Sequence, residues 1–260
     1  MSRFFTYPVW IFLLFICCEE AIEVPADDSG TPKLVVEGLL TSEFKPQEIT
    51  LTTSYINLNA TPPPVTNAQV ILHDGDTPIL LSHDPEVPGV YRTPNMQVLF
   101  GKTYTLAILH EGNQYYAQAS AAFGTPLPEL KYFPVDSSQY EYQYEDSVNS
   151  MTEVIITWPY GADSTVTRRA FYYTLGVIEV NSVFAPDKSP LRFPPGATIF
   201  RRKYSLTDSH QEFLRSFLSE VDWRGGAFDV EAANVLTNIT GGALGYFSVS
   251  VVDTDSTLVE

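Results

Sequence analysis

Short segments in which apolar and polar residues alternate run through most of this chain. Residues 48–55 read EITLTTSY and residues 103–110 read TYTLAILH, so every second side chain has the same character. A period of two is typical of a β-strand that buries one face. Nineteen prolines and fifteen glycines lie between and beside such segments, and this punctuation favours many short strands joined by turns.

The first half of the chain predicts an antiparallel sandwich. Glu111-Gly112-Asn113 is a turn signal, so residues 103–121 are expected to form a β-hairpin. The text VTNAQVILHDG and its continuation resemble the small immunoglobulin-like modules of bacterial surface proteins. We therefore expect a mainly β fold whose N-terminal part, residues 33–125, is an immunoglobulin-like sandwich. The expected strands are 33–40, 48–55, 68–73, 79–82, 89–93, 103–110 and 114–121.

A second β region with one amphipathic helix is expected over residues 126–260, after the Gly- and Pro-containing segment 124–128. Its expected strands are 153–158, 169–180, 198–206 and 243–252. The helix is expected at 209–223, where Ser209 and Glu212 fit a capping box. Its apolar face, which we expect to be buried, consists of Phe213, Leu214, Phe217, Leu218 and Val221.

The N-terminus has the pattern of a lipoprotein signal peptide, residues 1–17. Arg3 precedes an apolar run at 9–16, which is too short to span a bilayer, and the run ends in Cys17-Cys18. We favour Cys18 as the lipid-attachment residue because the small Cys17 precedes it, whereas the bulky Ile16 precedes the alternative, Cys17. A plain signal peptide with two incidental cysteines is the remaining interpretation. Residues 18–32 are acidic, contain Pro and Gly, and are expected to form a tether.

Charge and motifs narrow the function. Fifteen Lys and Arg against thirty-one Asp and Glu give a net charge of −16, which argues against a nucleic-acid partner. The basic segments 168–169 and 201–203 are expected to pair with carboxylates inside the fold. The four histidines are separate in sequence, and no hydrolase elbow, zinc-helix motif or phosphate loop is present. The sequence therefore predicts a protein that is not an enzyme and needs no metal or cofactor.

One aromatic stripe is the first candidate contact surface. Tyr140, Tyr142 and Tyr144 alternate within QYEYQYED, and on a strand they would form one face able to stack on sugars or peptides. The alternative is a strand or loop that covers the second β region. We expect these tyrosines to be more exposed than typical ones.

Other candidates are weaker. Three His–carboxylate pairs and two Asp-x-Asp triplets are expected to be turn residues rather than metal ligands. The glycine-rich segment 241–245 is expected to form a tight bend where backbones pack closely. Three Asp-Ser-x triplets resemble the acceptor of Bacteroidota O-glycosylation. Their serines are Ser147, Ser164 and Ser256.

A family resemblance covers roughly residues 33–250. The segments PKLVVEGLLTSE, SHQEFLRSFLSEVDW and AANVLTNITGGALGYFSVS, in this order, resemble the Bacteroidota lipoprotein family of domain of unknown function 4249. The resemblance implies an outer-membrane lipoprotein, often encoded beside a TonB-dependent receptor. Glu19 and Glu20, just after Cys18, resemble a signal for export to the cell surface.

These observations lead to one leading function and two alternatives. The chain is expected to be a lipid-anchored outer-membrane protein, held by N-terminal acyl chains such as palmitate and exposed on the cell surface. There it would act as a non-catalytic accessory or ligand-binding partner of a TonB-dependent receptor. The alternatives are a structural or adhesion module of the envelope, and a hydrolase with a carboxylate site at the domain junction.

Overall fold

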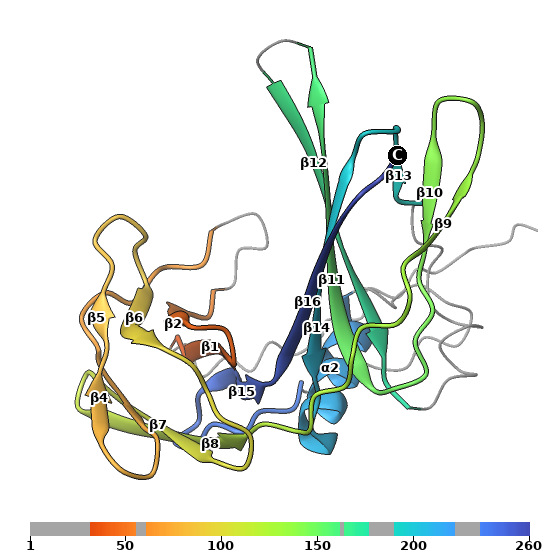
Figure 1. The fold of residues 1–260 in the computed structure, drawn as a ribbon. Helices are drawn as coiled ribbons and strands as arrows, with labels where there is room; N and C mark the ends of the chain where they lie inside the picture. Colours follow the sequence, from red (N-terminus) through yellow and green to blue (C-terminus); the bar gives the residue numbers. More distant parts are fainter. Residues whose placement is uncertain (1–31, 56–60, 162–163, 177–189, 222–234) are drawn as a thin grey trace, which may run out of the picture. The chain divides into compact units, whose positions relative to one another are not determined.

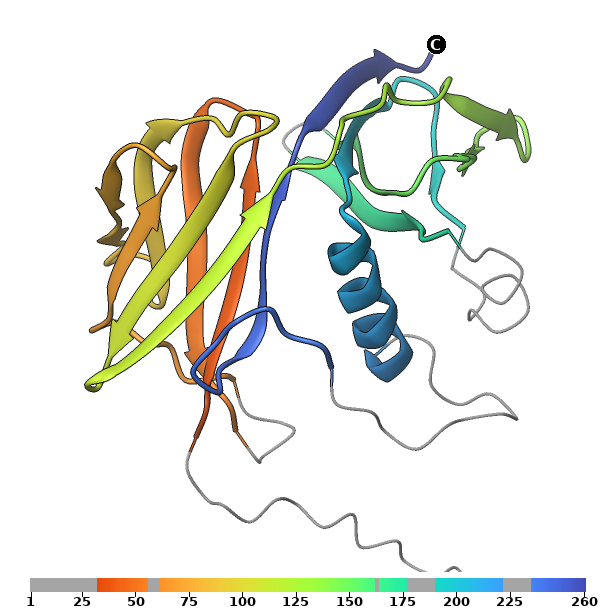
Figure 2. The ribbon, with the colours of Figure 1, turned by 90° about the horizontal axis from the view of Figure 1, so that it is seen from below.

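Two sheets face each other in the first part of the chain and enclose a common core (Figures 1 and 2). The computed structural model describes residues 32–55, 61–161, 164–176, 190–221 and 235–260. One sheet has the strand order β15-β1-β2-β6-β5 and the other has the order β4-β3-β7-β8. Their strands are β1 (Leu34–Thr41), β2 (Lys45–Thr53), β3 (Gln69–His73), β4 (Pro78–Leu80), β5 (Ser82–His83), β6 (Val90–Met96), β7 (Thr103–His110), β8 (Asn113–Ser120) and β15 (Leu244–Ser250).

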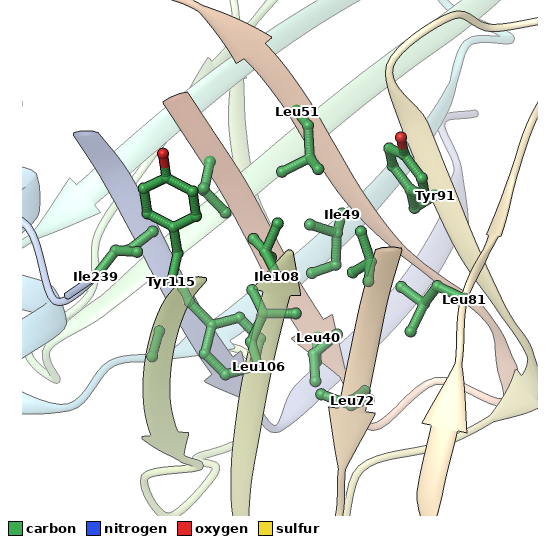
Figure 3. Packing of buried hydrophobic residues seen from close by; sticks show 14 of the residues in the cluster. Leu40, Ile49, Leu51, Leu72, Leu81, Tyr91, Leu106, Ile108, Tyr115 and Ile239 are labelled. Carbon is green, nitrogen blue, oxygen red and sulfur yellow. The ribbon is translucent and has the colours of Figure 1, made fainter. Parts of the chain in front are cut away.

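The alternation in the sequence explains the core. Leu106 and Ile108 of β7 point inward toward Leu40 and Ile49 of the opposite sheet, and Figure 3 shows these side chains interdigitating. All four are at most 3% exposed, and burying one such side chain stabilises the fold by about 1.5–3 kcal/mol. The expected mainly β fold with an N-terminal antiparallel sandwich is confirmed.

The β7–β8 hairpin forms as the turn signal predicted. His110 pairs with Asn113, which leaves Glu111 and Gly112 as a two-residue loop. Both have positive φ, 50° and 79°, which is the geometry that lets a hairpin turn follow the twist of its strands.

The last expected strand, 243–252, is two strands in two sheets. β15 runs parallel to β1 in the sandwich, whereas β16 (Val252–Leu258) pairs antiparallel with β14 (Thr198–Ser205). The chain therefore returns from the second β region to complete the first sheet. The division at residues 125 and 126 stays a prediction, and it did not foresee this exchange.

The second β region is a four-stranded sheet with both faces covered. Its order is β12-β11-β14-β16, with β11 at Ser150–Tyr160 and β12 at Ser164–Thr174. One face packs against a small sheet of β9 (Lys131–Pro134), β10 (Tyr140–Gln143) and β13 (Arg192–Phe193). The other face packs against helix α2 (Asp208–Val221) through Leu214 and Leu218. The expected strands did not include β9 and β13, which are four and two residues long, and β10 was foreseen only as one possible conformation of the tyrosine stripe.

Helix α2 differs from its prediction at its start and on its apolar face. Thr207, not Ser209, caps it: its hydroxyl accepts a hydrogen bond from the His210 amide at 3.3 Å. Leu214 and Leu218 are buried, but Phe217 is 41% exposed, so the expectation of a fully buried face is wrong at Phe217. The buried stripe is narrower because a helix that lies along a sheet brings only the side chains nearest to the sheet into contact.

Several predictions fall outside the described residues. These are the signal peptide 1–17, Cys17, Cys18, nearly all of the acidic tether, and residues 177–180 and 222–223 of the expected strand and helix.

Candidate functional site

Four large apolar side chains stand exposed at one end of the sandwich. Phe44 lies between β1 and β2, Leu99 and Phe100 lie between β6 and β7, and Phe123 follows β8. Their exposed fractions are 71%, 47%, 60% and 73% respectively. We call these four residues the apolar tip. Exposed apolar side chains that gather in one place mark contact sites more often than single ones do.

Backbone and ring contacts hold the tip in place. The Val98 amide donates to the Thr41 carbonyl at 3.1 Å, and the Leu99 amide donates to the Tyr104 hydroxyl at 2.9 Å. The rings of Phe100 and Phe123 meet edge to face, with centroids 5.6 Å apart. Aromatic pairs prefer this geometry, so two loops from different sequence regions present one arranged surface.

The segment that carries Phe123 is anchored on its other side to the second β region. Ser205 donates a hydroxyl hydrogen bond to the Ala122 carbonyl at 3.0 Å, and Lys203 Nζ donates to the Pro126 carbonyl at 3.1 Å. A Cβ on Gly124 would lie 2.5 Å from a methyl group of Val251, so only glycine fits there. Because these contacts fix the loop before any partner arrives, binding would cost little ordering entropy.

Sequence reasoning missed the apolar tip. Alternation identifies strands, but these phenylalanines lie outside strands, where no period exists. One signal was available: Phe100-Gly101 and Phe123-Gly124 place a large aromatic beside a glycine in a connecting segment, although such segments are usually polar.

Beside the tip, a charged network connects the β1–β2 hairpin with the second sheet. Glu153 of β11 has a side chain only 1% exposed and accepts a hydrogen bond from Tyr204 at 3.0 Å. It also forms ion pairs with Arg169 and Arg202. Arg202 Nε in turn lies 3.1 Å from an oxygen of Glu43, the residue before Phe44.

The opposite face of the same sheet holds two further ion pairs. Lys203 pairs with Asp146 at 2.8 Å, and Arg201 pairs with Asp255 on the neighbouring strand. Burial by itself raises the pKa of Asp146, but hydrogen bonds from Lys203, the Val148 amide and Ser150 outweigh it and hold the pKa below its ordinary value. The prediction that the basic segments pair with carboxylates inside the fold is confirmed for residues 169 and 201–203.

Two carboxylates of this junction take part in one ion-pair network. Glu43 and Glu153 share the guanidinium of Arg202. Burial raises the pKa of Glu43, but Lys45, Arg202 and Thr41 together lower it below its ordinary value. A catalytic acid needs a raised pKa, so Glu43 does not fit that role, and the hydrolase alternative stays a prediction.

The tyrosine stripe is not the exposed surface that was expected. Tyr142 is 6% exposed, and it packs with Phe193 and Ile199 in a hydrophobic cluster, with Tyr140 and Tyr144 against that cluster. The rings of Tyr144 and Tyr172 stack with their centroids 4.7 Å apart. Alternation correctly predicted that the three tyrosines share one face. It did not indicate whether that face would point to solvent or pack against the sheet of the second β region. The alternative, a strand that covers the second β region, is what the structure shows.

The expectation that the histidine and aspartate candidates are turn residues holds only in part. Asp74 and Asp76 lie in the turn after β3, but His73, His83 and His110 are the last residues of β3, β5 and β7. Asp253 and Asp255 lie within β16, so the expectation is wrong for that triplet. Asp74 accepts hydrogen bonds from the amides of Asp76 and Thr77, and Asp76 pairs with Lys102 at 2.8 Å. Within the described ranges, no group of three or more His, Cys, Asp or Glu side chains is placed to hold a metal ion.

The remaining sequence candidates are on the surface or at the bend. Ser147, Ser164 and Ser256 are all exposed, and their glycosylation stays a prediction. The glycine-rich segment does bend where backbones meet: Gly245 has a φ of 91°, and a Cβ there would lie 2.0 Å from the Val36 carbonyl oxygen. That prediction is confirmed.

The fold and its contacts define a β protein in which a sandwich and a helix-bearing second β region are joined by the successive strands β15 and β16. Comparison places it more closely: a family model described as "Domain of unknown function (DUF4249)" matches residues 19–256. The chain therefore belongs to the DUF4249 family.

The comparisons with solved structures and with curated proteins say less about this chain than the family model does. The FN1–FN3 domains of chicken CNTN1 match at 11% identity and a TM-score of 0.30, over 69% of this chain and 62% of that one. A two-domain fibronectin type-III segment of chicken tenascin matches at 12% identity and a TM-score of 0.20, over 68% and 91% of the two chains. No curated protein sequence matches. Among the helical residues that the structure describes, none forms a span long and apolar enough to cross a bilayer.

Proposed function

We propose that this chain is a bacterial, Bacteroidota-type lipoprotein that is anchored to the outer membrane through Cys18 and exposed on the cell surface. It acts there as a non-catalytic accessory or ligand-binding partner of a TonB-dependent receptor. The apolar tip is the surface that docks the receptor.

The observation that carries this proposal is the preformed, exposed pair Phe100 and Phe123. Aromatic side chains held rigidly in the open are the usual anchors of protein interfaces. The tip also lies next to Glu43 and Lys45, which form an ion pair at 2.6 Å. This arrangement provides the polar rim that such anchors need.

The lipid anchor strengthens a docking surface of this kind. A chain tethered in the same membrane as its partner gains effective concentration, so a modest patch suffices for a stable complex. The non-catalytic role is supported by the ion pairs of the junction, which use its carboxylates as structural partners of Arg202 and Arg169.

Co-purification from native membranes tests the proposal. The tagged wild-type chain, extracted in mild detergent, should retain a TonB-dependent receptor identified by mass spectrometry. Phe100→Ser combined with Phe123→Ser should lower receptor recovery by at least about tenfold, because a lost interface anchor typically costs about 2 kcal/mol or more.

Two controls accompany this experiment. Tyr160→Ala removes an aromatic side chain of similar exposure, 68%, at the end of β11 in the second β region and should leave receptor recovery unchanged. Cys18→Ser should release the chain from membranes or leave it unprocessed. Equal recovery with and without the two phenylalanines would reject the tip as the docking surface, and a wild-type chain without any receptor would reject the partnership.

A further inference from the structure

The outward face of the β4-β3-β7-β8 sheet carries no formal charge. Strand register and alternation place thirteen side chains on this face, and none is Asp, Glu, Lys or Arg. This is unexpected in a chain with a net charge of −16. We call it the uncharged face; it consists of Gln69, Ile71, His73, Pro78, Leu80, Thr103, Thr105, Ala107, Leu109, Gln114, Tyr116, Gln118 and Ser120.

An apolar track crosses this face at right angles to the strands. Register aligns Leu80, Ile71, Ala107 and Tyr116 on four neighbouring strands. Leu80 is 61% exposed and Tyr116 is 45% exposed. Three intervals between strands make the track about 14 Å long.

Rows of uncharged polar groups flank the track on both sides. The row toward the β7–β8 turn has Gln69 and Gln114 on either side of Leu109, which extends the apolar surface. The row on the other side consists of Pro78, His73, Thr105 and Gln118. Amides and hydroxyls both donate and accept hydrogen bonds. The charged residues Asp74, Asp76, Lys102 and Glu111 stand beyond the ends of the sheet, in its turns.

Internal hydrogen bonds arrange these groups before any ligand binds. The Tyr116 hydroxyl donates to Gln114 Oε1 at 2.9 Å, two positions earlier on the same face of β8. This bond directs the Tyr116 side chain along the strand toward Gln114. Gln118 donates to the Thr105 hydroxyl at 3.1 Å, which holds the second row.

We propose that the uncharged face binds a neutral polysaccharide across the strands, with its sugar rings on the track from Leu80 to Tyr116. Sugar rings have apolar C–H faces and hydroxyl edges, so they match an apolar track with amides and hydroxyls on both sides. An anionic ligand would find no cation on this face and would be repelled by the net charge of the chain. A cationic ligand would find no carboxylate there.

Native electrophoresis in gels that contain dissolved polysaccharide tests this inference. The full-length protein is kept in a detergent without sugar groups, and the gels contain an α-glucan, a β-glucan, a mannan or a xylan, with alginate as the acidic control. At least one neutral polymer should retard the protein, and alginate should not. Failure of all four neutral polymers, or equal retardation by alginate, would overturn the proposal.

Variants locate the binding on the uncharged face. Tyr116→Ala should lower the association constant by about two- to tenfold, since ring stacking contributes roughly 0.5–1.5 kcal/mol. Gln118→Ala should weaken it as well, with the thermal melting curve unchanged in both variants. Phe100→Ser, on the apolar tip, should bind polysaccharide like the wild type. Unaltered binding by Tyr116→Ala would contradict the assignment of the site.

Sedimentation of the same protein tests the competing occupant, a second copy of this chain. The protein should sediment as a monomer in detergent. A dimer that Leu80→Glu dissociates would show that the face serves self-association, and the proposal would be wrong. Polysaccharide binding is measured on the isolated protein. The result of that measurement therefore does not depend on whether the chain binds a TonB-dependent receptor.

Discussion

At the scale of single residues, the buried charges of the second sheet have the largest expected effects on stability. The side chains of Lys203 and Asp146 are 3% and 4% exposed. Because both charges are buried, Asp146 depends on Lys203 and on hydrogen bonds from Ser150 and the Val148 amide. Lys203 depends on Asp146 and on the Pro126 carbonyl. Replacing one member of such a pair leaves the other charge buried without compensation.

We expect Asp146→Asn to lower the free energy of unfolding by about 3–5 kcal/mol, measured by urea denaturation. Adding Lys203→Met should recover part of this loss, because the uncompensated charge is then gone. Asp76→Asn is the matched control: Asp76 pairs with Lys102 but is 77% exposed, so its loss should cost under about 1 kcal/mol. Similar costs for the two aspartates would refute the role of burial.

At the scale of elements, the first turn of α2 is built around a buried histidine. His210 is 6% exposed and stacks on Tyr246 of β15 with ring centroids 5.3 Å apart. Burial lowers the pKa of His210 to about 4. The neutral ring thus joins the helix to a strand of the sandwich sheet.

This histidine predicts a loss of stability in mild acid. The unfolded chain takes up a proton near pH 6.5, whereas folded His210 does so only near pH 4, so the free energy of unfolding falls as the pH drops through this interval. The contribution of His210 is about 3 kcal/mol at most. His210→Phe, which keeps a stacking ring but cannot titrate, should show a shallower decline in urea denaturation between pH 6.5 and 4.5. Carboxylates such as Asp146, whose pKa is lowered, are protonated and lose their stabilising contribution only at lower pH. An identical slope in both proteins would rule out His210 as the cause.

At the scale of the whole molecule, the end of the chain closes the sheet that its beginning opens. β15 pairs with β1 along its full length, and Gly245 faces Val36 in that register. The next residues continue into β16, and Val252 donates a hydrogen bond to the Ser42 hydroxyl at 2.9 Å. A defect at this pairing therefore affects the sandwich and the second β region together.

Gly245→Ala should lower the free energy of unfolding by roughly 3–5 kcal/mol, because the added methyl group would overlap the Val36 carbonyl. Gly112→Ala is the control for backbone strain alone. Gly112 also has a positive φ, 79°, but no atom lies within 4 Å of the position that a Cβ would take. It should therefore cost only about 1–2 kcal/mol, from backbone strain. Thermal or urea melting measures both variants, and equal losses would show that the close approach at Gly245 is unimportant.

The sequence by itself predicted what depends on neighbouring residues. Alternation in TYTLAILH and the turn at Glu111 and Gly112 set the β7–β8 hairpin to within one residue, because strand faces and turn geometry are local properties of the backbone. The sequence also predicted the bend near Gly245 and the pairing of residues 201–203 with acids, because the spacing of glycines and the balance of charges are properties of the sequence itself.

Only the tertiary structure decided which faces are covered and which strands meet. The period of two groups Tyr140, Tyr142 and Tyr144 on one side, but it is the contact with Phe193 and Ile199 that buries Tyr142. The apolar tip and the uncharged face are each assembled from segments far apart in sequence. The free energy that selects these pairings comes from burying surfaces against one another, and no single segment contains its own partner.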